Sequence, residues 1–256
     1  MFIDTHTHLY SESFDEDRDA MIARAQQKLI THFMLPAIDS TYTSKMWDLK
    51  KKYPDAMLVM AGLHPTHVKP ESLDNELDHV AQQLASRTHC AIGEIGIDLY
   101  WDQSTKQIQQ EAFAKQIQWA KEYDLPIVIH CRDAFDEVFE ILKNENNDRL
   151  RGVFHCFTGT EEDALQAINF NLKLGIGGVA TFKNGKIDQF LKKIDLKHIV
   201  LETDAPYLAP TPYRGKRNES SYLIEVAQKL SDIYNVSVTE IGEITTKNAK
   251  NIFNLD

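Results

Sequence analysis

Short apolar segments alternate with longer polar segments along most of the chain. The apolar segments are β-prone, whereas several polar segments carry the periodicity of amphipathic helices. This alternation is typical of β/α units and predicts a parallel sheet. Eight strands are predicted, at Phe2–Asp4, Ile30–Ala37, Met57–Gly62, Ala91–Gly93, Ile127–Ile129, Gly152–Phe154, Leu172–Ile176 and Ile199–Glu202.

Two of the intervening segments show clear helical signals. Thr160 is a plausible N-cap, because acidic residues follow it and suit a helix N-terminus. In the segment 105–123, the apolar residues fall on one helical face, at Ile108, Ala112, Phe113, Ile117 and Ala120. Eight strands with helical crossovers predict an α/β fold, a closed (β/α)8 TIM barrel. An open doubly wound sheet is the alternative, but no glycine-rich dinucleotide turn follows the first strand.

Composition is consistent with one large domain. The chain has 256 residues, of which 43% are hydrophobic and 26% charged, and we find no linker, repeat or low-complexity tract. We therefore expect a single domain over residues 1–256. No apolar run approaches the roughly 18 residues of a membrane span, and Asp4, His6 and His8 interrupt any signal peptide. The three cysteines are too few for a disulfide framework, so we expect a cytoplasmic protein without a membrane partner.

The formal net charge of -10 argues against a broad basic face that binds nucleic acid. Any polyanionic substrate would have to be held locally, by cations and a few arginines.

Polar residues follow the predicted strands repeatedly. In such barrels the chemistry lies at the C-terminal ends of the strands. Six of the ten histidines come just after an apolar run, together with several acids: His6, His8, His64, His67, Glu94, Asp98, His130, His155, Glu202 and Asp204. The other four histidines are interpreted as ordinary polar residues: His32, His79, His89 and His198.

Each of these residues alone would be interpreted as a cap or a solvated loop side chain. His6 and His8 are two residues apart, so an extended segment from Phe2 to His8 would aim both imidazoles one way. Together, the imidazoles and carboxylates form a set of ligands that suits a pair of divalent metals. The sequence therefore predicts a binuclear metal site at the mouth of the barrel.

The motifs FIDTHTHL, GLHP, AIGEIGIDLY, IVIHCRDA, FHCFTG, LETDAPYLAP, RGKRNE and TTKNAKNIF resemble those of the TatD family of metal-dependent deoxyribonucleases, over nearly the whole chain. The resemblance implies a (β/α)8 barrel with two divalent cations, either magnesium, manganese or zinc, and leaves a third cation open. It assigns one metal to His6, His8, Glu94 and Asp204, and the other to Glu94, His130 and His155. The implied activity is exonucleolytic release of nucleotides from DNA, from single strands or 3′ ends.

Glu94 and Asp204 are the expected catalytic carboxylates. A binuclear centre needs an anionic ligand that holds its cations about 3.5–4 Å apart. Glu94 fits this role, since its strand contains no lysine that could be carboxylated instead. Asp204 can ligate a metal and accept a proton from the attacking water, which makes it the candidate general base. Glu202 either binds a ligand imidazole or ends its strand facing the helices.

Cys131 and Cys156 directly follow His130 and His155. Strand alternation would turn both thiols away from the face that the histidines use, which predicts packing roles. A Cys–His nucleophile pair is the weaker alternative, because no third orienting group is evident.

Substrate recognition is predicted for a basic loop after the last strand. Arg214, Lys216 and Arg217 lie within four residues, and their side chains can hold a phosphate, while Tyr213 or Tyr207 can stack on a base. The alternative is an exposed basic loop paired with surface acids.

Two further residues are candidates for contact with substrate. His64 is expected to bond a phosphate oxygen or the leaving group, as a further catalytic and substrate-binding residue. Arg132 either does the same or pairs with Asp133.

The hypothesis is a metal-dependent phosphodiesterase, in which a metal-activated hydroxide attacks a DNA phosphorus. Two alternatives remain: the same centre acting on an ester, amide or lactone, and a non-catalytic metal-stabilised scaffold. We expect the protein to be a monomer.

Overall fold

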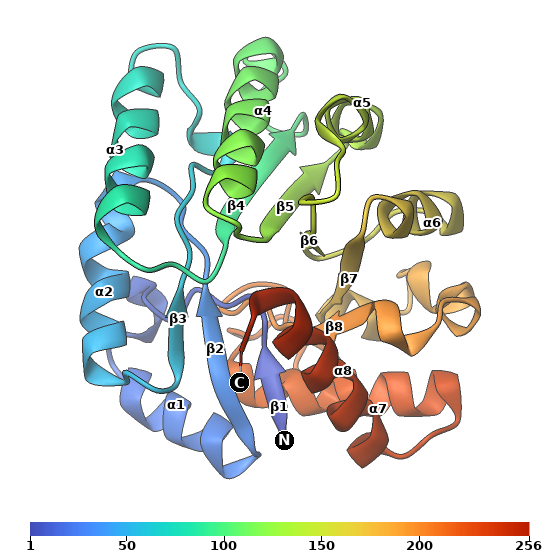
Figure 1. Ribbon diagram of the computed structural model, residues 1–256. Helices are drawn as coiled ribbons and strands as arrows, with labels where there is room; N and C mark the ends of the chain where they lie inside the picture. Colours follow the sequence, from blue (N-terminus) through green and yellow to red (C-terminus); the bar gives the residue numbers. More distant parts are fainter. Residues whose placement is uncertain (256) are drawn as a thin grey trace.

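Eight parallel strands run through the centre of the molecule, and helices surround them (Figure 1). The computed structural model describes residues 1–255. The strands are β1 (Phe2–Asp4), β2 (Ile30–Leu35), β3 (Met57–Val59), β4 (Ile92–Asp98), β5 (Ile127–Arg132), β6 (Gly152–Phe154), β7 (Leu172–Ile176) and β8 (Ile199–Leu201).

The ring of strands is closed. Hydrogen-bonded neighbours follow the chain order, first from β1 to β3 and then from β4 to β8. Isolated bridges join the two groups at Ala61 with Ile92 and at Thr7 with Ala205. The predicted (β/α)8 barrel is therefore confirmed, and the open doubly wound alternative is excluded.

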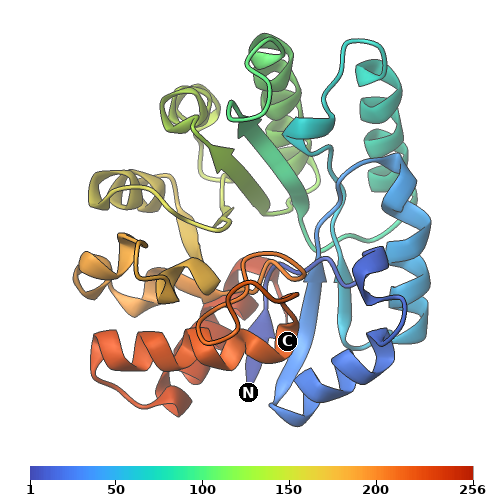
Figure 2. The same ribbon diagram turned by 180° about the vertical axis from the view of Figure 1, so that it is seen from behind.

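The helices are α1 (Arg18–Gln27), α2 (Thr43–Lys52), α3 (Leu73–Ser86), α4 (Lys106–Glu122), α5 (Phe135–Glu145), α6 (Glu161–Asn169), α7 (Leu223–Tyr234) and α8 (Val238–Phe253). Seen from behind, they form an outer layer around the barrel (Figure 2). Short 3-10 turns replace the helix between β7 and β8. Thr160 caps α6 as predicted, with its hydroxyl accepting from the Asp163 N–H at 3.2 Å. Within residues 1–255, no helix combines the length and apolar character needed to cross a membrane.

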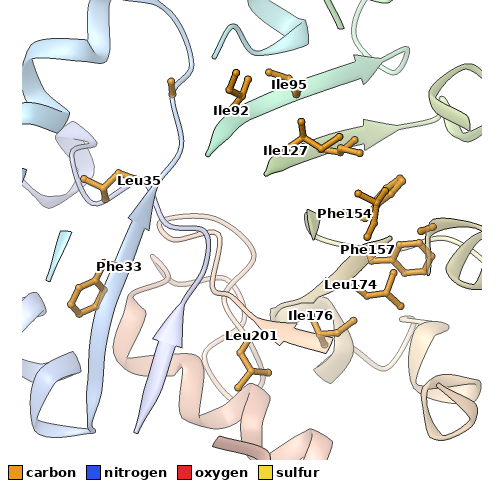
Figure 3. Packing of buried hydrophobic residues seen from close by; sticks show 14 of the residues in the cluster. Phe33, Leu35, Ile92, Ile95, Ile127, Phe154, Phe157, Leu174, Ile176 and Leu201 are labelled. Atoms are coloured by element: carbon orange, nitrogen blue, oxygen red, sulfur yellow. The ribbon is translucent and has the colours of Figure 1, made fainter. Parts of the chain in front are cut away.

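Successive side chains of a strand point to opposite sides and so belong to two different buried layers. In β2, Phe33 and Leu35 belong to the large cluster between strands and helices, part of which Figure 3 shows. Met34, between them, belongs to a second cluster. That cluster takes residues from several strands, from the segment just after β3 and from α8, including Ile3, Met60, Val128, Val153, Val200, Ile252 and Phe253. This inner layer fills the barrel, and the polar residues gather beyond it.

Several strand boundaries differ from the prediction. β2, β3 and β8 end earlier than expected, at Leu35, Val59 and Leu201, although the residues that follow them are still buried. The extended segment expected from Phe2 to His8 is a strand only as far as Asp4. β4 and β5 are longer, because their ladder continues until Asp98 pairs with Arg132. Backbone pairing does not require apolar side chains, so a pattern of apolar residues underestimates the lengths of β4 and β5.

Candidate metal centre

The C-terminal ends of the strands surround a cavity of about 590 Å³. Five of the six predicted metal ligands line it, namely His8, Glu94, His130, His155 and Asp204, together with His64, which was predicted to contact substrate. His6 is completely buried and contacts Glu94. The structure thus brings together side chains from six of the eight β/α units.

An irregularity in β4 positions Glu94. The pairing with β5 shifts register between Gly93 and Ile95. The Glu94 N–H donates instead to the Ala37 carbonyl at 3.1 Å. Such bulges commonly redirect one side chain of a strand.

The two carboxylate oxygens of Glu94 face different imidazoles. Oε2 lies 3.1 Å from His6 Nε2 and 3.9 Å from His8 Nε2. Oε1 lies 2.9 Å from His130 Nδ1 and 3.7 Å from His155 Nε2. A carboxylate in this arrangement can bridge two cations, each with its own pair of imidazoles.

Asp204 faces both groups of imidazoles. It follows β8 in a left-handed conformation (φ 56°), which Asp tolerates better than most residues. Its N–H donates to the His6 carbonyl at 2.9 Å, which ties this loop to the first strand. Asp204 Oδ1 lies 3.4 Å from His8 Nε2 and 3.8 Å from His155 Nε2.

His6 provides a test of whether cations fit this site. Within residues 1–255, neither ring nitrogen of this fully buried side chain forms a hydrogen bond of good geometry, and the nearest acceptor to Nε2 is the Glu94 carboxylate at 3.1 Å. Its ring stacks on His155, with centroids 3.4 Å apart. A buried polar atom without a partner is costly. A cation held by His6, His8 and Asp204, whose ligand atoms lie within 4.8 Å of one another, would remove that cost for one of the two nitrogens.

Two further buried carboxylates contact His155 and His130, each at the ring nitrogen that does not face Glu94. Glu202 Oε1 lies 3.0 Å from His155 Nδ1, so of its two expected positions Glu202 takes the one against the imidazole. Gly175 makes room for it, since a Cβ there would lie 2.2 Å from Glu202 Oε2. Asp98 Oδ2 lies 2.8 Å from His130 Nε2. Sequence reasoning gave Asp98 no role, although its even spacing from Glu94 was a usable signal.

Tyr10 fixes the orientation of His8, and the sequence gave no prediction for it. Its hydroxyl donates to the Pro36 carbonyl at 2.5 Å and lies 2.8 Å from His8 Nδ1. Since the phenolic proton is already used, Nδ1 of His8 carries the proton of the neutral ring. The free electron pair on Nε2 then faces Asp204 and the cavity.

The charges of this cluster favour a cation. Burial alone would lower the pKa of His155, but the charges of Glu202 and Glu94 raise it to about 10. Burial likewise opposes ionisation of Glu94, yet the neighbouring His64 and His6 hold its pKa well below the usual range. Proton and metal therefore compete for the same nitrogen of His155.

His64 differs from the other histidines at the cavity. The Thr66 N–H donates to its Nδ1 at 3.2 Å, so the neutral ring carries its proton on Nε2. That nitrogen lies 3.3 Å from Glu94 Oε1. Burial lowers the pKa of His64 to about 4, which leaves a neutral hydrogen-bond donor in the cavity at neutral pH. His67 remains half exposed, 3.5 Å from Asp39.

The structure does not bring the basic loop into the cavity. Arg217 donates to both carboxylate oxygens of Asp17 at 2.7 and 2.8 Å, and to the Ser13 carbonyl at 2.7 Å. The Arg214 guanidinium lies over Phe182, 3.5 Å from the ring centroid. Neither arginine lines the cavity.

Two other residues predicted to contact substrate do reach the cavity. Tyr207 and Arg132 both line it. Asp133 was the alternative partner expected for Arg132, but the two side chains form no ion pair within the described chain. Tyr213 stacks on Tyr222 with centroids 3.9 Å apart, and lies outside the lining.

The prediction that both thiols turn away from the site was wrong. Cys131 and Cys156 line the cavity. Cys156 has a left-handed backbone (φ 43°) after β6 ends, so strand alternation no longer applies to it. Burial raises the pKa of the Cys131 thiol to about 12, and that of Cys156 well above its usual value. Protonated thiols are poor nucleophiles, which argues against a Cys–His pair.

Comparison with known proteins finds similar sequences and structures over nearly the whole chain. The family model described as TatD-related DNase matches residues 3–254. YabD, an uncharacterized metal-dependent hydrolase of Bacillus subtilis (strain 168), is 38% identical, with 100% of both chains covered. The 3′-5′ ssDNA/RNA exonuclease TatD of Pectobacterium carotovorum is 30% identical, covering 98% of this chain and 99% of the relative. The crystal structure of YjjV, a TatD homologue from Escherichia coli K12, has a TM-score of 0.93 at 30% identity, covering 100% of this chain and 98% of that one.

Proposed function

Because the chain belongs to the TatD family of metal-dependent hydrolases, we propose that it hydrolyses phosphodiester bonds of DNA as a 3′–5′ exonuclease. The observation that carries the proposal is the position of Glu94, whose two oxygens face separate pairs of imidazoles. The name of the Pectobacterium relative supports the direction and the substrate class.

Two divalent cations would be held by the residues around Glu94. His6, His8 and Asp204 would hold one, and His130 and His155 the other, with Glu94 shared between them. Divalent cations bound in this way lower the pKa of water and neutralise charge on a phosphoryl group.

Asp204 is the proposed proton acceptor. Burial alone would raise the pKa of Asp204, but its contact with His8 holds that pKa below the usual range. The carboxylate is therefore ionised at neutral pH and can take a proton from the attacking water. Its Oδ1, which faces imidazoles from both pairs, is placed between the two halves of the site.

His64 and Arg132 are the proposed contacts to the substrate. The Nε2–H of His64 can donate to a phosphate oxygen or to the leaving oxygen. Arg132 can hold a phosphate oxygen at the cavity rim. Arg217 is already bound to Asp17, so we assign the phosphate contact to Arg132 instead.

Single-stranded DNA labelled at either end tests this function. Protein freed of metal and reloaded with magnesium, manganese or zinc is expected to shorten the strand from its 3′ end, and chelator is expected to stop the reaction. Glu94→Gln should lose activity and bound metal together, whereas Glu122→Gln, at the exposed end of α4, should retain both.

A generic aryl ester in the same assay separates the alternatives. Hydrolysis of the ester without DNA cleavage would assign the centre to an ester, amide or lactone. Metal binding that stabilises the fold without turnover of either substrate would indicate a scaffold.

A further inference from the structure

Two large aromatic side chains lie exposed beside the cavity. Trp101 is 70% exposed and Tyr100 is 54% exposed, in the connection that follows β4. Together with Arg132 of β5 we call them the rim platform. Trp101 and Arg132 line the cavity itself. Exposed aromatic groups at the edge of a site commonly mark a binding surface.

The platform holds a guanidinium by stacking alone. Arg132 Cζ lies 3.6 Å from the centroid of the Tyr100 ring and 5.5 Å from that of Trp101. The two rings meet edge to face, with centroids 4.9 Å apart. Among residues 1–255, no acceptor forms a hydrogen bond or ion pair with the Arg132 side chain. Its N–H groups are thus oriented by the aromatic face and remain available to a ligand.

One carboxylate connects the platform to the candidate metal centre. Asp98 Oδ1 accepts from the N–H groups of Tyr100 and Trp101 at 3.0 and 3.2 Å. Its other oxygen, Oδ2, contacts His130 Nε2. Asp98 also pairs with Arg132 in the β4–β5 ladder. The platform therefore has a fixed position relative to His130.

We propose that the rim platform binds an unpaired nucleobase and its adjoining phosphate, with Trp101 stacking on the base and Arg132 donating to the phosphate. This inference rests on the proposed function and names how that site selects its substrate. Stacking on aromatic side chains tolerates any base, because every base has a π-face. Bases inside a duplex are covered by their neighbours, so the platform favours a single-stranded segment.

The charge of the molecule supports local recognition of this kind. With a net charge of -10, the protein as a whole repels nucleic acid. A free guanidinium at the cavity and an aromatic surface next to it supply attraction where the cleaved bond must lie. The stacking contribution does not depend on charge.

Binding of two matched oligonucleotides tests the proposal on the metal-loaded protein. One is a nuclease-resistant phosphorothioate oligothymidylate, and the other has the same backbone with abasic residues. We expect Trp101→Ala to weaken binding of the thymidylate about 10-fold and to leave the abasic strand unaffected. Arg132→Ala should weaken both, and Trp101→Tyr should restore most of the loss. On cleavable single strands, Trp101→Ala should raise KM with little change in kcat.

Tyr123→Ala and Arg149→Ala are matched controls at the opposite end of the barrel, after α4 and before β6. Both should bind like the wild type. Unchanged binding of the thymidylate by Trp101→Ala would overturn the proposal, as would an equal loss on both strands. Wild-type protein that binds but cleaves nothing, with the Trp101 dependence intact, would support the platform while refuting the nuclease. Cleavage that does not depend on Trp101 would refute the platform alone.

Discussion

Three of the four imidazoles that face a proposed cation, those of His8, His130 and His155, are held by a second polar group. Tyr10 contacts His8, and Asp98 and Glu202 contact His130 and His155. These contacts determine which ring nitrogen is turned toward the cavity. They should therefore control metal affinity without touching the metal.

Glu202→Gln and Asp98→Asn test these contacts. Each removes a negative charge behind a histidine while preserving the volume of the side chain. We expect metal affinity to fall about 10–100-fold in each variant. A competition titration with a chelating dye measures this, with exposed Asp148→Asn as the control. Affinity equal to the wild type in both variants would show that the contacts are only structural.

The sequence could identify the histidines, but of their partners it offered only Glu202, as one of two alternatives. His6, His130 and His155 each follow an apolar run, and that position is visible in the chain. The link from Tyr10 to His8 depends on the Pro36 carbonyl, which only the folded loop brings near. Cys156 was placed wrongly because its backbone leaves the extended region just after β6.

At the scale of the elements, β4 has a backbone conformation that requires glycine at position 96. Gly96 has a φ of 142°, which only glycine adopts readily, and a Cβ there would lie 2.0 Å from the His130 carbonyl oxygen. The close approach of β4 and β5 is what sets Glu94 beside His130. The positions of Glu94 and Asp98 thus depend on the glycine that lies between them in β4.

Gly96→Ala should be strongly destabilising. Backbone strain alone costs about 1–3 kcal/mol, and the overlap with β5 adds to it. Gly215→Ala is the control, because its φ is 80° but nothing lies within 4 Å of the added Cβ. We expect a cost of about 1 kcal/mol there. Urea unfolding measures both, and equal costs would mean that the approach of the two strands is unimportant.

The loop after β8 is tied to the start of the chain by Arg217. Its hydrogen bonds, and those of Arg24, lower the pKa of Asp17. A carboxyl group whose pKa is lowered by folding stabilises the protein above its unfolded pKa of 3.8, and this contribution is lost as the pH falls below that value.

Arg217→Ala should therefore lower the melting temperature in a pH-dependent manner. Both side chains are about one-third exposed, so the pair contributes at most about 1 kcal/mol, or about 2–4 °C. The difference from the wild type should be constant between about pH 8 and 5 and shrink below about pH 4. Thermal unfolding followed by circular dichroism measures it. A constant difference down to pH 3 would assign the effect to packing on Phe14 instead.

For the whole molecule, barrel closure is what makes a site from distant residues. Thr7 pairs with Ala205, which places His6 and His8 beside Asp204. The alternation of strands and helices predicts this closure, since the first and last strands of such a barrel are neighbours. The pairing of Arg217 with Asp17 depends on loop conformation, which no pattern of apolar residues encodes.

A crystal soaked in manganese, with anomalous scattering recorded from the bound ions, tests the central claim most directly. Two peaks are expected, one on each side of the Glu94 carboxylate. One should lie against His6, His8 and Asp204, and the other against His130 and His155. Absence of any peak at Glu94, or peaks only outside the cavity, would contradict a binuclear centre at these residues.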